Sequence, residues 1–172
     1  MDFITGLPMN WRQHDSIMVV VDKLKKASHF ISIKSTHKID DIAKIVMKDI
    51  FKLHGLPKAV VSDRDVKFSS NFWKGMFAEL GTKLNFSTTY HPQTDGQTER
   101  VNQVLEDMLR MYVMEKPSKW EDYLHLVKFS YNNGKKKSMG MSPFKALYGK
   151  NCTTPVTWDN KRIVSVLYLG QD

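Results

Sequence analysis

Hydrophobic positions along the chain follow two different periods, and each change of period marks a boundary between predicted elements. Residues 16–23 and 27–34 are β-rich runs separated by a lysine-rich turn, which predicts a β-hairpin. Over residues 40–53 the apolar side chains recur every three or four positions, the period of an amphipathic helix. Gly55 and Pro57 are expected to end this helix.

The remainder of the chain alternates short apolar runs with helical patterns. In order, the pattern predicts strand 58–62, helix 69–80, strand 83–87, helix 97–115, helix 120–131 and a short last helix after Ser142. Ser69 and Ser142 are the expected N-caps of the helices that follow them. The helical period places Glu99 on the face opposite the apolar residues of its helix. The order β, β, β, α, β, α, β, α, α predicts an α/β protein, with a mixed sheet flanked by helices.

Length and composition suit a single folded domain, since the chain has 172 residues of which 41% are hydrophobic. We assign residues 1–154 to this domain and residues 155–172 to a linker or frayed tail. The longest apolar run, 17–21, is too short to span a membrane, and the start of the chain lacks the pattern of a secretory signal. The single cysteine, Cys152, excludes an internal disulfide framework and a zinc finger that needs two cysteines.

The charge of the chain favours a polyanionic partner, because the net charge is +8 and the isoelectric point is near 9.5. Most of the excess lies in residues 116–150, which hold eight Lys or Arg residues and two acids. Lys135, Lys136 and Lys137 form the sharpest cluster, after an Asn-Asn-Gly loop sequence. A solvated lysine-rich surface explains such a cluster equally well on its own. A phosphate-handling site elsewhere in the chain would favour nucleic-acid contact instead.

Three carboxylates stand at predicted strand or helix ends, where side chains can converge on one cleft. Asp63 closes a predicted strand and Glu99 opens a predicted helix, with 35 residues between them, while Asp2 lies in a short alternating stretch. The spacing alone is weak, because Glu79 and Glu115 are equally far apart. Carboxylates from separate elements are what a pair of divalent cations needs to activate a nucleophile and stabilise a leaving phosphate oxygen.

The sequence around these acids resembles the D,D,E core of retroviral-type integrases, most closely that of gypsy-type LTR retrotransposons. The resemblance covers roughly residues 1–155. The blocks that carry it are Asp-Phe (2–3), Val-Ser-Asp-Arg-Asp (61–65), His-Pro-Gln-Thr-Asp-Gly-Gln-Thr-Glu-Arg-Val-Asn (91–102) and Gly-Met-Ser-Pro-Phe-Lys-Ala-Leu-Tyr-Gly (140–149). It implies a ribonuclease-H-like fold with a mixed five-stranded sheet and a central first strand. Because the chain starts at Met1, we expect that strand to be short.

The resemblance also implies what the site does. Asp2, Asp63 and Glu99 would be the catalytic residues and would bind two Mg²⁺ or Mn²⁺ ions. The activity would be DNA integration, in which the 3′ end of retroelement DNA is processed and then transferred to target DNA. The expected partners are retroelement ends, target DNA and further copies of the chain, with no membrane, and the expected place of action is the nucleus. The resemblance also implies nucleic-acid contacts, in addition to those of the lysine cluster, at Tyr90, Asp95, Gln97, Asn102 and Gln103.

Two other functions remain open from the residues. One is a catalytically inactive integrase remnant that acts as a nucleic-acid-binding or assembly domain. The other is an enzyme that cleaves RNA in RNA–DNA hybrids, which shares the fold and the metals but not the 91–102 block. Single acids also have simpler explanations: Asp65 is expected to stabilise a turn or loop, and Asp22 to have a structural role.

Overall fold

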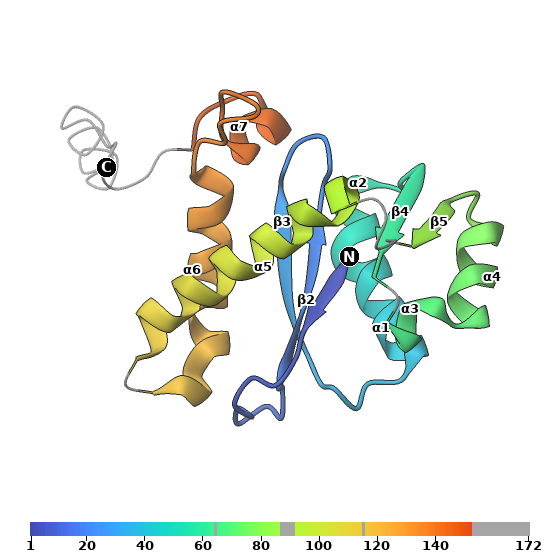
Figure 1. The fold of residues 1–172 in the computed structure, drawn as a ribbon, viewed down its shortest axis with the longest axis horizontal. Coiled ribbons are helices and arrows are strands. Elements are labelled where there is room, and N and C mark those ends of the chain that lie inside the picture. The colour runs from blue at the N-terminus through green and yellow to red at the C-terminus, as the bar shows by residue number, and fades with distance from the viewer. Residues whose placement is uncertain (64, 87–91, 115, 153–172) are drawn as a thin grey trace, which may run out of the picture.

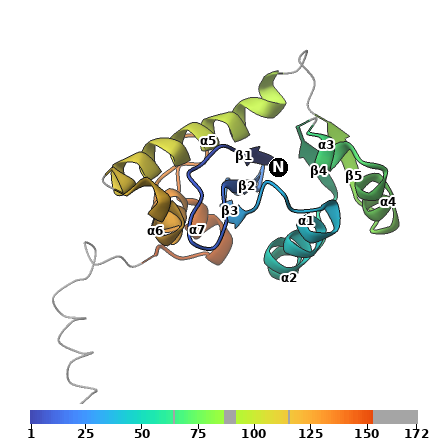
Figure 2. The same ribbon diagram turned by 90° about the horizontal axis from the view of Figure 1, so that it is seen from below.

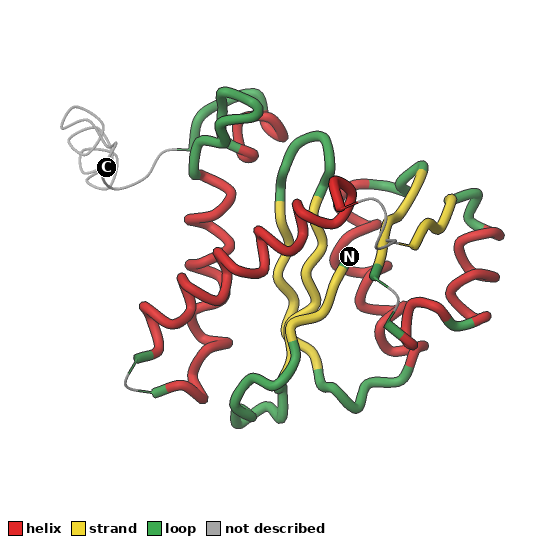
Figure 3. The backbone as a smooth tube through the Cα atoms, in the orientation of Figure 1, coloured by secondary structure: helices red, strands yellow, loops and turns green. Residues whose placement is uncertain are grey.

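The computed structural model describes residues 1–63, 65–86, 92–114 and 116–152 (Figures 1 and 3). Of Val66 and residues 92–97 only the backbone is described. The strands are β1 (Asp2–Ile4), β2 (Ser16–Val21), β3 (Ser28–Ile33), β4 (Ala59–Ser62) and β5 (Lys83–Phe86). The helices are α1 (Ile39–Val46), η1 (Met47–Phe51), α2 (Lys52–His54), α3 (Val66–Ser69), α4 (Asn71–Glu79), α5 (Pro92–Val113), η2 (Pro117–Lys119), α6 (Trp120–Asn133) and α7 (Pro143–Tyr148).

The strands form two sheets with different pairing. Strands β1, β2 and β3 form an antiparallel sheet in that order, and β4 pairs with β5 in parallel. The amino group of Met1 donates a hydrogen bond of 2.6 Å to the carbonyl oxygen of Val61, which joins the start of β1 to β4. This contact links the two sheets, which are otherwise paired separately as β1-β2-β3 and β4-β5. The predicted mixture of parallel and antiparallel strands is thus present, although the described strands pair as three plus two.

Strand β2 shows how one sheet is covered on both faces. Because side chains alternate along a strand, Ile17 and Val19 face one way and Met18 faces the other. The first face packs against α5 and α6 through residues such as Leu105, and the second packs against α1 and against α4 through residues such as Trp73. Figure 2 shows α5 and α1 on opposite sides of β1, β2 and β3.

The predicted order of strands and helices is confirmed, with differences at helix ends. The helix predicted over 40–53 is present as α1, η1 and α2, and η1 is a π-helical segment. Ser142 caps α7 as predicted, since its Oγ accepts the Lys145 N–H at 3.2 Å. The cap predicted at Ser69 is wrong, because Ser69 ends the short helix α3 and Ser70 caps α4.

Helix α5 begins at Pro92, five residues before its predicted start. Proline suits the first turn of a helix, where its missing N–H would have no partner within the helix. None of the described helices is long and apolar enough to cross a membrane.

Candidate active site

Two of the three predicted carboxylates come together where the sheets meet. Asp2 is the first residue of β1, and Asp63 follows the last residue of β4. Asp2 shares the strand face of Ile4, which lies in the core beneath α5. Backbone donors hold both groups: the Phe3 N–H bonds to Asp2 Oδ1 at 2.8 Å, and the Asp65 N–H bonds to Asp63 Oδ1 at 3.3 Å. The start of β1 and the end of β4 therefore bring the carboxylates of Asp2 and Asp63 next to each other.

The environment of Asp63 disfavours its negative charge. Burial, together with the charge of the nearby Asp2 carboxylate and a hydrogen bond to it, raises the pKa of Asp63 to about 6. The Asp65 N–H acts in the opposite direction and lowers this pKa. A divalent cation between the two carboxylates would replace their repulsion by attraction. The electrostatics of the pair thus suit a metal site.

Helix α5 reaches this pair through Asn102. The Asn102 Nδ2 donates a hydrogen bond of 2.5 Å to Asp2 Oδ2, so the helix orients that carboxylate. The Oδ1 of Asn102 and the Oγ of Ser62 are buried and have no hydrogen-bond partner among the described residues. Buried oxygens without a partner are costly unless water or an ion satisfies them. The Asn102 Oδ1 lies on the side chain that bonds Asp2, whereas Ser62 shares the strand face of Val60 in the core under α1 and α4. The two carboxylates supply oxygen ligands of the kind that Mg²⁺ prefers.

Glu99 lies on the same helix but apart from the pair. It is exposed, as the helical period predicts, and precedes Asn102 by three residues, so both side chains lie on neighbouring turns of one helix face. Within the described residues, no group of three or more His, Cys, Asp or Glu side chains could hold a metal ion. The structure therefore brings Asp2 and Asp63 together without Glu99, and the three-carboxylate site stays a prediction.

The other residues predicted to contact nucleic acid are spread along the start of α5 and the segment before it. Tyr90 lies outside the described residues, and Asp95 and Gln97 fall in α5 where side chains are not described. Gln103 is exposed on α5. Asn102 has the described role of holding Asp2, which the sequence alone did not indicate. Its position three residues after Glu99 was the available signal. Contact of these residues with DNA stays a prediction.

The lysine cluster lies in the loop after α6, and its three members differ. Lys135 and Lys137 are exposed. The Nζ of Lys136 lies 3.3 Å from the centre of the Tyr131 ring, and burial lowers the pKa of Lys136. This cation–π contact holds the Lys136 side chain against Tyr131, whereas the exposed side chains of Lys135 and Lys137 can contact a ligand. The contribution of the cluster to DNA binding stays a prediction.

The simpler roles expected for two other acids are confirmed. Asp65 caps α3, with its Oδ1 accepting the Lys67 N–H at 2.8 Å. Asp22 stabilises the turn after β2, with its Oδ1 accepting the N–H groups of Leu24 and Lys25.

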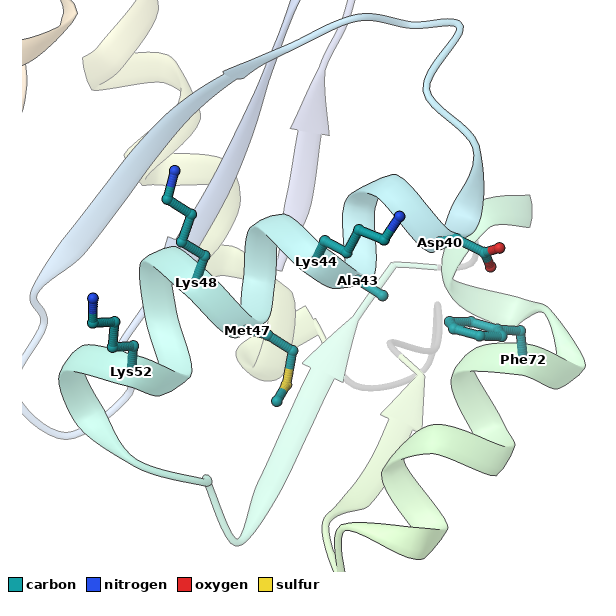
Figure 4. Close-up of a pocket in the computed structure, with 7 residues that line it drawn as sticks. All are labelled: Asp40, Ala43, Lys44, Met47, Lys48, Lys52 and Phe72. Atoms are coloured by element: carbon teal, nitrogen blue, oxygen red, sulfur yellow. The ribbon is translucent and has the colours of Figure 1, made fainter.

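Two pockets lined by described residues lie away from the carboxylates. One of about 610 Å³ runs along α1 and η1, where Met47 and Phe72 point into the space between two helices and Lys44 and Lys48 stand on its rim (Figure 4). Another of about 490 Å³ lies between the β1–β2 connection and the end of α5. Neither is lined by Asp2, Asp63 or Glu99. The charges and hydrogen bonds of the carboxylate pair identify the candidate site better than cavity size does.

Comparison with known proteins gives relatives of two kinds. No family model matches the chain. The chain is 34% identical over 148 residues to the Transposon Tf2-3 polyprotein of Schizosaccharomyces pombe, and this alignment covers 86% of the chain. The chain spans only 11% of the length of that polyprotein, and the same holds for its Tf2-4 counterpart.

Solved structures with similar folds share little sequence. The HTLV-2 integrase catalytic core domain in complex with magnesium has a TM-score of 0.63 at 14% identity, over 84% of this chain and 92% of that one. A chain of the simian T-cell lymphotropic virus intasome, in complex with PP2A regulatory subunit B56 gamma, has a TM-score of 0.70 at 14% identity, over 92% of this chain and 59% of that one. These likenesses confirm the predicted fold class.

Proposed function

We propose that this chain processes and joins DNA ends. It is a homologue of retrotransposon polyproteins, and it has the ribonuclease-H-like fold of retroviral-type integrase catalytic cores. The reaction would consist of two phosphoryl transfers. In the first, water attacks a phosphodiester near the 3′ end of retroelement DNA and releases the terminal nucleotides. In the second, the freed 3′-hydroxyl attacks a phosphodiester of target DNA, and the target 3′-oxygen leaves.

The side chains of this chain would hold the reacting groups in position. Asp2 and Asp63 would provide carboxylate oxygens for divalent cations, and Glu99 would complete the set. Bound Mg²⁺ or Mn²⁺ would supply the Lewis acid that activates the nucleophile and stabilises the leaving oxygen. Asn102 would keep Asp2 oriented toward this site through its 2.5 Å hydrogen bond. Glu99 lies one turn before Asn102 on the same face of α5, on the side of the helix that holds Asp2.

One observation carries this proposal: Asp2 and Asp63, from separate strands, share a half-buried position where burial and mutual repulsion raise the pKa of Asp63. Structural ion pairs would need a positive partner there, and the described hydrogen bonds give the two carboxylates only backbone N–H and amide donors. An unneutralised carboxylate pair is costly unless a cation is bound. The arrangement therefore favours a metal-dependent enzyme.

The experiment is strand transfer from a labelled DNA duplex into a target plasmid with Mg²⁺ or Mn²⁺. The parent should form joined products. Glu99→Gln should reduce them to background, because the change removes a charge while keeping the size of the side chain. Helix α5 should persist, since Glu99 is exposed and Gln is a good helix former. DNA affinity should hold or rise, because a negative charge near phosphate is lost.

The matched control is Glu79→Gln. Glu79 is exposed at the end of α4, remote in sequence from the predicted site blocks, so its variant should retain activity. Strand transfer by Glu99→Gln at the parent's level would contradict the three-carboxylate site. Preferential cleavage of RNA in an RNA–DNA hybrid would support the alternative enzyme instead.

A second candidate function is an inactive remnant that binds nucleic acid or assists assembly. The separation of Glu99 from the Asp2–Asp63 pair favours it. A folded parent that binds DNA but forms no joined product with either metal would support this function.

The partners of the proposed reaction follow from its chemistry. The chain would bind retroelement ends and target DNA through a net charge of +8. Solved relatives include a trimeric integrase core and an intasome, and we propose that this chain also works as a homo-oligomer. Action on chromosomal target DNA would place it in the nucleus.

A further inference from the structure

Two histidines that the proposed reaction does not use face each other beside the sheet. His29 is the second residue of β3, and His54 is the last residue of α2. Their Nε2 atoms are 2.8 Å apart, and the rings meet edge to face with centres 4.8 Å apart. His29 is half-buried and His54 is exposed, so solvent reaches the pair from one side. Two elements separated by 25 residues thus direct the same ring nitrogen at one point.

The His29 ring can present a lone pair near neutral pH. Burial lowers the pKa of His29 to about 4, with the charges of Lys128 and His54 adding to this effect and Asp22 opposing it. His29 is therefore neutral at pH 7, and one nitrogen of the facing pair must act as the acceptor of the hydrogen bond. Neutral imidazole is the form of histidine that binds metal ions.

Charges of both signs lie around the pair. Lys128 of α6 places a half-buried positive charge near His29, and burial lowers the pKa of Lys128. Asp22 acts on His29, and Asp49 of η1 acts on Lys128, both with the opposite sign. Lys128 acts on His29 more strongly than Asp22 does, so the nearest charges oppose a bound cation. A metal ion at this pair would therefore be held by its bonds to the imidazole nitrogens and not by attraction to the surrounding charges.

The separation of the two nitrogens suits a transition metal. With metal–nitrogen bonds of about 2.0 Å, adjacent ligands of a square-planar ion are about 2.8 Å apart and those of a tetrahedral ion about 3.3 Å apart. The observed 2.8 Å meets the first value. The second requires the exposed His54 ring to move by about half an ångström.

We propose that His29 and His54 bind one divalent transition-metal ion that prefers imidazole, such as Zn²⁺, Ni²⁺ or Cu²⁺, independently of the carboxylate site. No third His, Cys, Asp or Glu joins them among the described residues, so water completes the coordination. The ion replaces the hydrogen bond between the rings and fastens the end of α2 to β3. Mg²⁺ does not occupy this site, because it prefers oxygen ligands.

The test is a titration of Ni²⁺ or Zn²⁺ into the full chain, with excess Mg²⁺ present to occupy the carboxylates. Calorimetry should show one equivalent bound, and the thermal unfolding midpoint should rise with metal concentration because the ion binds the folded state. His54→Ala should remove both effects and, because His54 is exposed, leave the metal-free midpoint nearly unchanged. His125→Ala, which removes another exposed histidine, on α6, should bind metal as the parent does.

A second variant tests the charge argument. Lys128→Gln removes the ammonium that opposes the bound cation, and it should tighten metal binding several-fold relative to the parent. The proposal is overturned if His54→Ala binds Ni²⁺ and Zn²⁺ as the parent does. It is also overturned if the parent shows no saturable binding, in which case the histidines form only a hydrogen bond.

Discussion

Removing the charge of Asp63 should stabilise the metal-free protein at neutral pH. The change Asp63→Asn keeps the shape of the side chain and an oxygen that can accept the Asp65 N–H. It removes the repulsion from Asp2 and the cost of burying a carboxylate, the two leading causes that raise the pKa of Asp63. The free energy of unfolding should therefore rise above that of the parent.

The size of this effect follows from the pKa. A change from the ordinary value of 3.8 to about 6 would correspond to about 3 kcal/mol, because each tenfold change in proton affinity is worth about 1.4 kcal/mol. Asp63 is only half-buried, so solvent screening reduces the expected gain to about 1–2 kcal/mol.

The gain should also depend on pH with a defined sign. The raised pKa means that the folded protein binds the Asp63 proton more tightly than the unfolded chain does. The stability that this proton contributes is fully present below about pH 3.8 and is lost as pH rises through about 6. The difference between Asp63→Asn and the parent should thus be full at pH 7.5 and shrink as pH falls toward 4.

Urea unfolding at pH 7.5, 6 and 4.5 without divalent metal measures this difference, with the exposed Glu79→Gln as the control that should show none. Adding Mg²⁺ should stabilise the parent and leave Asp63→Asn unaffected, which would reverse the order of stability at high metal concentration. A parent as stable as Asp63→Asn at pH 7.5, or a difference that does not change with pH, would refute the reasoning.

Two further predictions concern the lysine loop and a buried tryptophan. Changing Lys135 and Lys137 together to Ala should reduce the slope of log DNA affinity against log salt by about 2, since each lost phosphate contact removes about 0.9. Lys136→Ala should leave that slope nearly unchanged and instead lower stability by about 1 kcal/mol, through loss of its cation–π contact. Trp120→Phe should cost about 1–3 kcal/mol in urea unfolding, because the Pro8 carbonyl loses the Trp120 Nε1 donor at 2.8 Å; an unchanged midpoint would show that water replaces this bond.

Local patterns in the sequence were enough to predict most of the secondary structure. The apolar period of 40–53 reflects a helix face that packs on the sheet, and Ile42 and Val46 are indeed fully buried there. Ser142 followed by proline carried enough information to place the start of α7. The error at Ser69 arose because two adjacent serines offer equivalent hydroxyls. Which of them caps α4 depends on the short helix α3 before it, and no periodic pattern marks that helix.

The site could be predicted only in part because it depends on contacts between distant residues. The residue types and the sequence stretches that resemble integrases were enough to select Asp2 and Asp63, and the structure places these two residues together. The hydrogen bond from Asn102 to Asp2 spans 100 residues, so the local sequence could place Asn102 near Glu99 but could not identify Asp2 as its partner. The facing of His29 and His54 likewise depends on where α2 ends relative to β3.

The two faces of β2 determine how the protein should lose its structure. Ile17 and Val19 belong to the core under α5 and α6, while Met18 belongs to the core under α1 and α4. Neither core can open while β2 stays in place with its side chains packed, and displacing β2 exposes both cores at once. The strand therefore couples the two halves of the molecule into one cooperative unit. Hydrogen exchange of the β2 amides should accordingly proceed only through global unfolding, with the same free energy whether it is measured beside one core or the other.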